Sequence, residues 1–110
     1  MTILLFYATV QTMKMVRAHL FISGLVQGVY FRANTVDIAR LHGVSGWVGN
    51  NPDGTVEAVL EGQLNAVERV ISWCRTGPPK AHVDNVSIAW EEYADEFTDF
   101  SAILRKQSGG

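Results

Sequence analysis

The chain has 110 residues, of which 47% are hydrophobic and 18% charged, values typical of one folded globular domain. Its formal net charge of −2 argues against a general nucleic-acid-binding protein, which is usually basic. Cys74 is the single cysteine, so no disulfide can form within the chain, and we expect a buried, inert thiol and a cytoplasmic location.

Residues 1–15 stand apart from the pattern of the rest of the chain. Residues 3–8 are apolar, but they fall far short of the ~20 residues that a membrane-spanning helix requires. No lysine or arginine precedes Lys14, so the sequence does not indicate a signal peptide. We expect an extension that adds an edge strand or contacts a second copy of the chain, while the domain itself is expected to be a monomer.

The alternation of apolar and polar side chains over residues 16–22 predicts a strand. A helical pattern follows over residues 32–42 and ends at Gly43. Residues 44–50 and 55–61 predict two strands, and the Asp-Gly turn between them indicates a hairpin. The side chains expected to face the core from the first strand are Val16, Ala18, Leu20 and Ile22, and those from the last are Val56, Ala58 and Leu60. The residues of the last strand expected to face away are Thr55, Glu57, Val59 and Glu61.

The second half of the chain predicts another helix and another strand. Residues 63–76 form the helix, and the Gly-Pro-Pro run that begins at Gly77 ends it. Residues 83–90 predict a strand, residues 91–96 an acidic, solvated loop, and residues 97–104 a short closing strand. The side chains expected to face inward from the strand are Val86, Ile88 and Trp90. The apolar stripe expected on the helix is Leu64, Val67, Val70, Ile71 and Cys74.

The order strand, helix, strand, strand, helix, strand (βαββαβ) predicts an α+β fold of the ferredoxin-like, split βαβ type. In this sandwich two helices cover one face of an antiparallel sheet. The expected domain spans residues 16–105, and residues 106–110 are expected to form a flexible tail.

Residues 24–32, GLVQGVYFR, join the first strand to the first helix. Two glycines let such a loop curl and aim its backbone N–H groups at one point beside a helix N-terminus, which favours an anion. Arg32 in the first helical turn opposes the helix dipole at a cost of roughly 0.3–1 kcal/mol, and a bound anion would compensate. A surface arginine screened by solvent is the alternative. The loop lacks the lysine and hydroxyl of a P-loop and the spacing of a dinucleotide fold, so a small phosphate compound is favoured.

Asn50 ends the third predicted element, close in the expected fold to the loop that carries Arg32. Its carboxamide can donate and accept hydrogen bonds, so it can orient a water without titrating. The alternative is that Asn50 and Asn51 are ordinary turn residues. The three histidines of the chain show no metal-ligand spacing, so no metal site is expected; they are His19, His42 and His82.

Two long motifs, taken together, resemble the acylphosphatase family. Residues 24–32 match its pattern GxVQGVxFR, and residues 46–57, GWVGNNPDGTVE, match GWVxNxxDGxVE. Residues 77–83, GPPKAHV, also look like the family's GPPxAxV segment, and the resemblance covers residues 16–105. The departures are Tyr30, where the family often has glycine, and Gly49, where it often has a charged residue.

The resemblance implies hydrolysis of a carboxyl–phosphate anhydride to a carboxylate and orthophosphate, by attack of a water, with no metal or other cofactor. It implies that Arg32 binds the phosphoryl group and that Asn50 orients the attacking water. The residues whose backbone amides are implied to cradle the phosphate oxygens are Val26, Gln27, Gly28, Val29, Tyr30, Phe31 and Arg32.

Two other functions compete with hydrolysis of a small-molecule acyl phosphate. A ferredoxin-like module that binds phosphate or another anion without turnover would use Arg32 and its loop, but it would leave Asn50 unexplained. An RNA-binding sheet requires an aromatic and basic platform, and the expected open face is poor in both. That face would show Arg17, His19, Phe21, Glu57 and Val59. We therefore expect neither a nucleic-acid partner nor a membrane partner.

Overall fold

The computed structural model describes residues 10 and 12–104. The expected strand or second-chain contact of residues 3–8 and the tail of residues 106–110 lie outside these. The elements follow the predicted order, with boundaries shifted by a few residues. They are β1 (Met15–Leu25), α2 (Phe31–Leu41), β2 (Ser45–Asn50), β3 (Val56–Gln63), α3 (Leu64–Thr76), β4 (His82–Glu91) and β5 (Phe100–Ile103).

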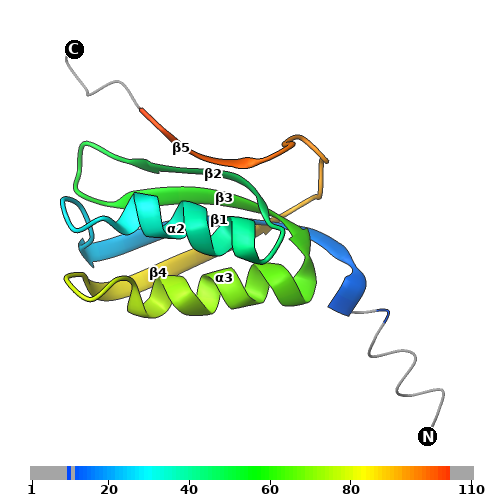
Figure 1. Cartoon of the computed structure of the whole chain (residues 1–110), viewed down its shortest axis with the longest axis horizontal. Helices are drawn as coiled ribbons and strands as arrows, with labels where there is room; N and C mark the ends of the chain where they lie inside the picture. The colour runs from blue at the N-terminus through cyan, green and yellow to red at the C-terminus, as the bar shows by residue number, and fades with distance from the viewer. Residues whose placement is uncertain (1–9, 11, 105–110) are drawn as a thin grey trace, which may run out of the picture.

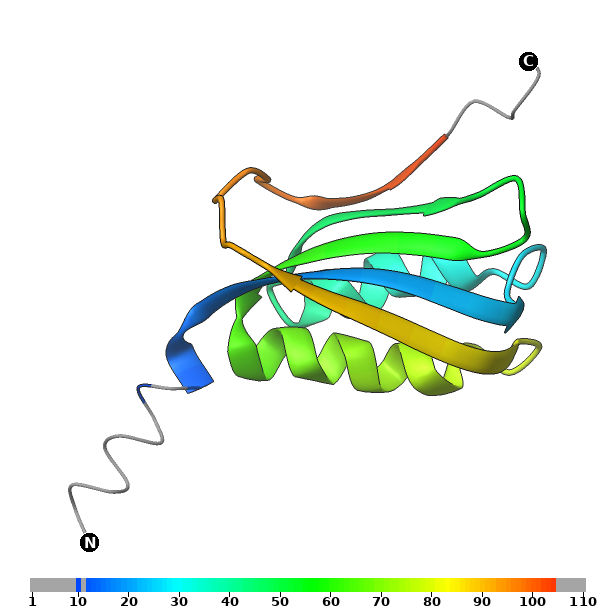
Figure 2. The ribbon, with the colours of Figure 1, turned by 180° about the vertical axis from the view of Figure 1, so that it is seen from behind.

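The strands form one sheet in the order β4-β1-β3-β2-β5. Both helices lie on the same face (Figure 1), and the opposite face carries no helix (Figure 2). The ferredoxin-like α+β prediction is therefore confirmed. The prediction of a wholly antiparallel sheet is wrong at one edge, because β5 pairs with β2 in parallel. The cause is the connection after β4, which crosses the sheet at the end where β4 finishes, so that β5 runs opposite to β4 and along β2.

The core lies between the helices and the sheet. The predicted inward residues of β1 and β3 are fully buried, except that Val16 is half-buried. On α3, Leu64 is half-buried and the rest of the predicted stripe is buried. Burial raises the pKa of the Cys74 thiol to about 12, so its reactive thiolate is scarcely populated, as expected. None of the helices in the described part of the chain is long and apolar enough to cross a membrane.

Trp90 differs from its prediction. The sequence pattern places it inward with Val86 and Ile88, but its side chain is 53% exposed, whereas the other two are half-buried. Alternation predicts which face a residue occupies, but it does not predict how well that face is covered. Because β4 is an edge strand with β1 on one side only, its last residues are incompletely covered.

Three of the four residues predicted to face away from the core in the β3 arm of the hairpin are nevertheless buried, since Glu57 is 8% exposed and Val59 and Glu61 are each 1% exposed. Val59 pairs in register with His19 and Trp47, whose rings flank it with centroids 6.3 Å apart. The Glu61 carboxylate accepts hydrogen bonds from two backbone N–H groups of the connection after β4. These come from Ala94 at 2.8 Å and Glu96 at 2.9 Å. The predicted solvated loop is therefore anchored to the sheet by a buried carboxylate.

Candidate functional site

The β1–α2 loop and the β2–β3 turn lie at the same end of the sheet in both views (Figures 1 and 2). Between them is a cleft of about 310 Å³ that contains both Arg32 and Asn50. The fold therefore brings Asn50 close to the loop that carries Arg32, as the sequence predicts. The full lining of the cleft is Val26, Gly28, Tyr30, Phe31, Arg32, Ala33 and Asn50.

The β1–α2 loop curls through two left-handed residues, Gly28 with φ of 73° and Tyr30 with φ of 65°. Tyr30 is the N-cap of α2, but its side chain makes no capping hydrogen bond, and the first turn has no acidic residue. The first backbone N–H groups of a helix have no partner within it. Here neither a cap nor a carboxylate neutralises them, so this helix end is suited to an anion.

The start of α2 is held firmly. Phe31 is 1% exposed, and its ring centroid lies 5.4 Å from that of Trp73 on α3. The Thr35 hydroxyl donates a 2.7 Å hydrogen bond to the Phe31 carbonyl. Arg32 follows this anchored residue and is half-buried at the cleft. Within residues 10 and 12–104 its guanidinium has no ion pair or side-chain hydrogen bond, so its donors are available to a ligand.

Asn50 ends β2 opposite Val56 of β3. Its Oδ1 is the one buried side-chain nitrogen or oxygen of the described residues that lacks a hydrogen-bond partner. Such an atom typically costs about 1–3 kcal/mol, so it calls for an explanation. The turn itself does not use this side chain. Asn51 makes the local hydrogen bonds instead, from its N–H to the Thr55 carbonyl at 2.9 Å and from Nδ2 to Thr55 Oγ1 at 3.0 Å.

Gln27 connects the two halves of the site. Its Nε2 donates to the carbonyl oxygens of Asn51 at 2.8 Å and Thr55 at 2.9 Å, which ties the loop to the β2–β3 turn. The resemblance implies only a backbone role for Gln27, so the sequence did not predict this side-chain contact. The only signal in the sequence was the residue type, because an amide has two N–H donors that need acceptors. The acceptors themselves could not be predicted, since they lie far along the chain.

The remaining predicted cradle residues divide between the cleft and the core. Gly28 lines the cleft, Val26 lines the cleft and also belongs to the hydrophobic core, and Val29, which is 8% exposed, belongs to the core alone. Apolar side chains of the loop are therefore packed in the core while the loop borders the cleft. A loop supported in this way is held in one shape before a ligand arrives.

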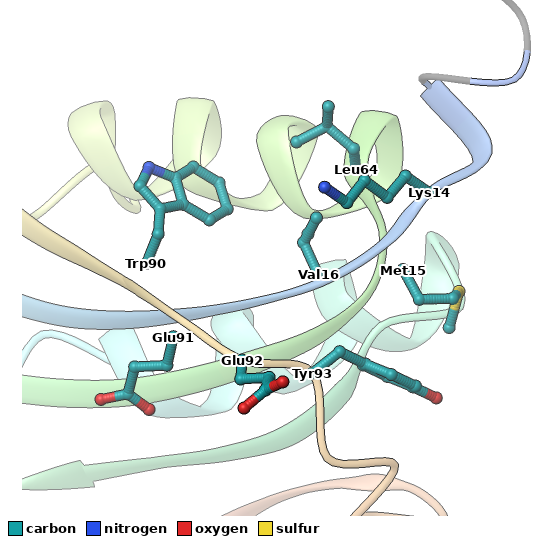
Figure 3. Close-up of a pocket in the computed structure, with 8 residues that line it drawn as sticks. All are labelled: Lys14, Met15, Val16, Leu64, Trp90, Glu91, Glu92 and Tyr93. Atoms are coloured by element: carbon teal, nitrogen blue, oxygen red, sulfur yellow. The ribbon is translucent and has the colours of Figure 1, made fainter.

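A larger hollow of about 570 Å³ lies at the opposite end of β1, where α3 begins and β4 ends (Figure 3). It is lined by Trp90, by Lys14 and by two glutamates, Glu91 and Glu92. The Glu91 carboxylate is paired with Arg17 at 2.9 Å, and Glu92 adds a second negative charge. Lys14 is the one cationic side chain among the lining residues, so the hollow is poorly suited to a phosphate. Within the described part of the chain no three His, Cys, Asp or Glu residues gather as potential metal ligands. The smaller cleft is therefore the candidate site.

Comparisons with known proteins identify the family of the whole domain. The family model named acylphosphatase matches residues 18–102. An acylphosphatase from Pyrobaculum calidifontis is 54% identical over 94 residues, which cover 84% of this chain and 86% of the relative. One from Pyrobaculum arsenaticum is 58% identical over 89 residues, covering 80% and 94%. The crystal structure of acylphosphatase from Bacillus subtilis has a TM-score of 0.77 and 30% identity, and the match covers 80% of this chain and 98% of that chain.

Proposed function

The chain belongs to the acylphosphatase family and hydrolyses acyl phosphates, and we propose that Arg32 and Asn50 are the residues that carry its reaction. One observation carries the proposal: Arg32 and Asn50, whose buried Oδ1 has no hydrogen-bond partner, line the same cleft beside the uncapped start of α2. An arginine, a helix N-terminus and a neutral acceptor are what an anionic phosphoryl group and an attacking water require.

Arg32 and the loop hold the phosphoryl group. The planar guanidinium donates two parallel hydrogen bonds to phosphoryl oxygens, which fixes orientation as well as charge. The backbone amides of residues 26–32 bind the remaining oxygens. Because phosphoryl transfer depends mainly on position and on charge stabilisation, this arrangement supplies most of what the reaction needs.

Asn50 positions the nucleophile. Its carboxamide forms a hydrogen bond with a water and orients that water's lone pair toward phosphorus. A new oxygen–phosphorus bond forms as the phosphorus–oxygen bond to the acyl group breaks, and the carboxylate leaves with the electron pair. The proton of the water passes to a phosphoryl oxygen, which gives orthophosphate. Because a carboxylate is a good leaving group, no general acid is required, and a neutral amide suffices where a base is usual.

A non-catalytic anion-binding module has less support. Arg32 and the α2 N-terminus fit both functions, but anion binding alone gives no role to the buried Asn50 oxygen. Family membership favours the hydrolase as well.

We also infer a monomeric protein in the cytoplasm, with a domain of residues 16–105, a peripheral extension of residues 1–15 and a tail of residues 106–110. The single buried cysteine supports a reducing compartment, because a chain with one cysteine forms no internal disulfide that an oxidising compartment would stabilise. Size-exclusion chromatography with light scattering tests the monomer, and a dimer would point to the extension as the contact.

The direct experiment is the release of orthophosphate from benzoyl phosphate and acetyl phosphate by the full-length protein in EDTA. We expect equal amounts of carboxylate and orthophosphate from the wild type and no turnover from Arg32→Ala. Binding of inorganic phosphate by the wild type without turnover would instead establish the anion-binding module. Full activity of Arg32→Ala would overturn the assignment of this residue.

A further inference from the structure

Tyr30 adopts a backbone conformation that glycine adopts without strain. Its φ is 65° and its ψ is 23°, which is the left-handed region that a residue with a Cβ occupies at a cost. The backbone is fixed there by Asn34, whose N–H and Nδ2 both donate to the Tyr30 carbonyl, at 3.1 and 2.9 Å. The start of α2 therefore requires this conformation, and it would form more easily with glycine.

The tyrosine side chain makes no contact in the described part of the protein that would offset this strain. It is 71% exposed, and within the described residues it makes no side-chain hydrogen bond and no ring contact. A strained residue with an unused side chain at the edge of a functional cleft points to a role in function.

The position of Tyr30 suggests that role. Three residues that line the cleft are exposed, namely Gly28, Tyr30 and Ala33, and of these only Tyr30 has a large side chain. The phosphoryl group is held by Arg32 and the loop amides, and the acyl group is bonded to it. The acyl group therefore lies on the side of the phosphoryl group away from Arg32, and the one sizeable exposed side chain at the cleft is that of Tyr30.

We propose that Tyr30 forms a subsite for the acyl group and favours acyl phosphates whose acyl group is aromatic. The inference rests on the proposed function, because it assumes that the phosphoryl group lies at Arg32. A tyrosine ring offers a flat apolar face to another ring, and aromatic pairs of ordinary strength change a binding constant about 3- to 10-fold. A methyl group such as that of acetyl phosphate offers no ring to stack and has little apolar area.

The test is the ratio of kcat/KM for benzoyl phosphate to kcat/KM for acetyl phosphate, measured for four full-length proteins. These are the wild type, Tyr30→Phe, Tyr30→Gly and Tyr30→Asn. Phenylalanine keeps the ring and loses the hydroxyl. Glycine removes the ring and relieves the strain, and asparagine removes the ring while tolerating the left-handed conformation. The ratio cancels any change in loop stiffness or phosphate binding, because both substrates share those.

We expect Tyr30→Phe to keep the wild-type ratio and Tyr30→Gly and Tyr30→Asn to lower it about 3- to 10-fold. An unchanged ratio in the two variants without a ring would overturn the subsite while leaving the hydrolase intact. A ratio that falls equally in Tyr30→Phe would also overturn it, since the hydroxyl would then be the determinant. Failure of the wild type to hydrolyse either substrate would overturn the proposed function and the subsite together.

Discussion

Two arginines of this protein have opposite surroundings. On the helix-free face of the sheet, Arg17 lies within 2.9 Å of Glu91 and Glu96 and 3.5 Å of the buried Glu61. The pKa of Glu91 is lowered, chiefly by a hydrogen bond from His19 and next by one from Arg17. At the end of the sheet where α2 begins, Arg32 has no such partner among the described residues, and the nearby Asn50 Oδ1 has none either.

The difference separates charges that hold the fold from groups that await a ligand. The Arg17 network joins β1, β3 and β4 to the connection that leads to β5, so its bonds are complete in the protein alone. The groups at the cleft are held in place by packing and by Gln27, but their own bonding capacity is unused. Substitutions in the two regions are therefore expected to act on different quantities.

The largest effect is expected from Arg32→Ala. Loss of a guanidinium that binds a desolvated anion typically costs about 2–5 kcal/mol, so affinity for inorganic phosphate and turnover should both collapse. Arg32→Lys should also fail, because a point charge does not reproduce the planar fork. Titration calorimetry with phosphate measures the loss, and a thermal melt checks that the fold is kept.

Arg40→Ala is the matched control for this prediction. Arg40 lies in the last turn of the same helix and pairs on the surface with Asp99 at 3.0 Å. Exposed pairs contribute little, about 0–1 kcal/mol, so phosphate affinity should be unchanged. Equal losses in Arg32→Ala and Arg40→Ala would mean that general positive charge, and not the site, attracts the anion.

The paired region should respond in stability. Glu61→Ala removes a buried carboxylate that accepts two backbone hydrogen bonds and faces Arg17, so the free energy of unfolding should fall by about 2–5 kcal/mol. Activity per folded molecule should be unchanged. Glu92→Ala, an exposed neighbour, should stay within about 0.5 kcal/mol of wild type in urea denaturation. A stable Glu61→Ala variant with impaired catalysis would reverse the roles of the two regions.

A smaller effect is expected where the two halves of the site are joined. Gln27→Ala removes both hydrogen bonds to the β2–β3 turn, so Arg32 and Asn50 lose their fixed spacing, and kcat/KM should fall about 10-fold. Gln27→Glu should lose at least as much, because a carboxylate cannot donate to the two carbonyls. Steady-state kinetics of both variants would contradict the account if each stayed at the wild-type value.

Removal of residues 1–9 should have the smallest effect, with activity within about twofold of wild type, because every cleft residue lies far downstream. Removal of residues 1–14 should lower stability by about 0.5–1.5 kcal/mol more, since the Lys14 carbonyl accepts a 2.8 Å bond from the Leu64 N–H. Thermal melts and activity assays of both truncations separate these outcomes. A folded but inactive protein lacking residues 1–9 would show that the extension shapes the cleft.

The sequence predicted the parts of this protein that depend on local pattern. Period-two alternation placed Ala18, Leu20 and Ile22 in the core, and helical spacing placed Val67 and Cys74 there. The order of the predicted elements led to the fold, and the two motifs led to the family. The roles of Arg32 and Asn50 remain predictions that the shared cleft supports.

What the sequence could not predict depends on residues that are distant in the chain. Glu61 is buried because two backbone groups more than 30 residues away reach it. Trp90 is exposed because β4 lies at an edge of the sheet. The alternation of apolar and polar residues does not predict which strand is at an edge. The hydrogen bonds of the Gln27 side chain and the missing partner of Asn50 Oδ1 also require a three-dimensional structure. Each depends on where the end of one side chain lies in space.

Adjacent asparagines allow the most direct test of the claim that the Asn50 carboxamide at the cleft positions the nucleophile. The measurement is kcat for orthophosphate release from benzoyl phosphate by Asn50→Ala and Asn51→Ala. The account predicts that Asn50→Ala loses about 10²–10³ in kcat with little change in KM. Asn51→Ala, whose side chain only bonds within the turn, should stay within about threefold of wild type. A kcat for Asn50→Ala within a few-fold of wild type, or an equal loss in both variants, would contradict it.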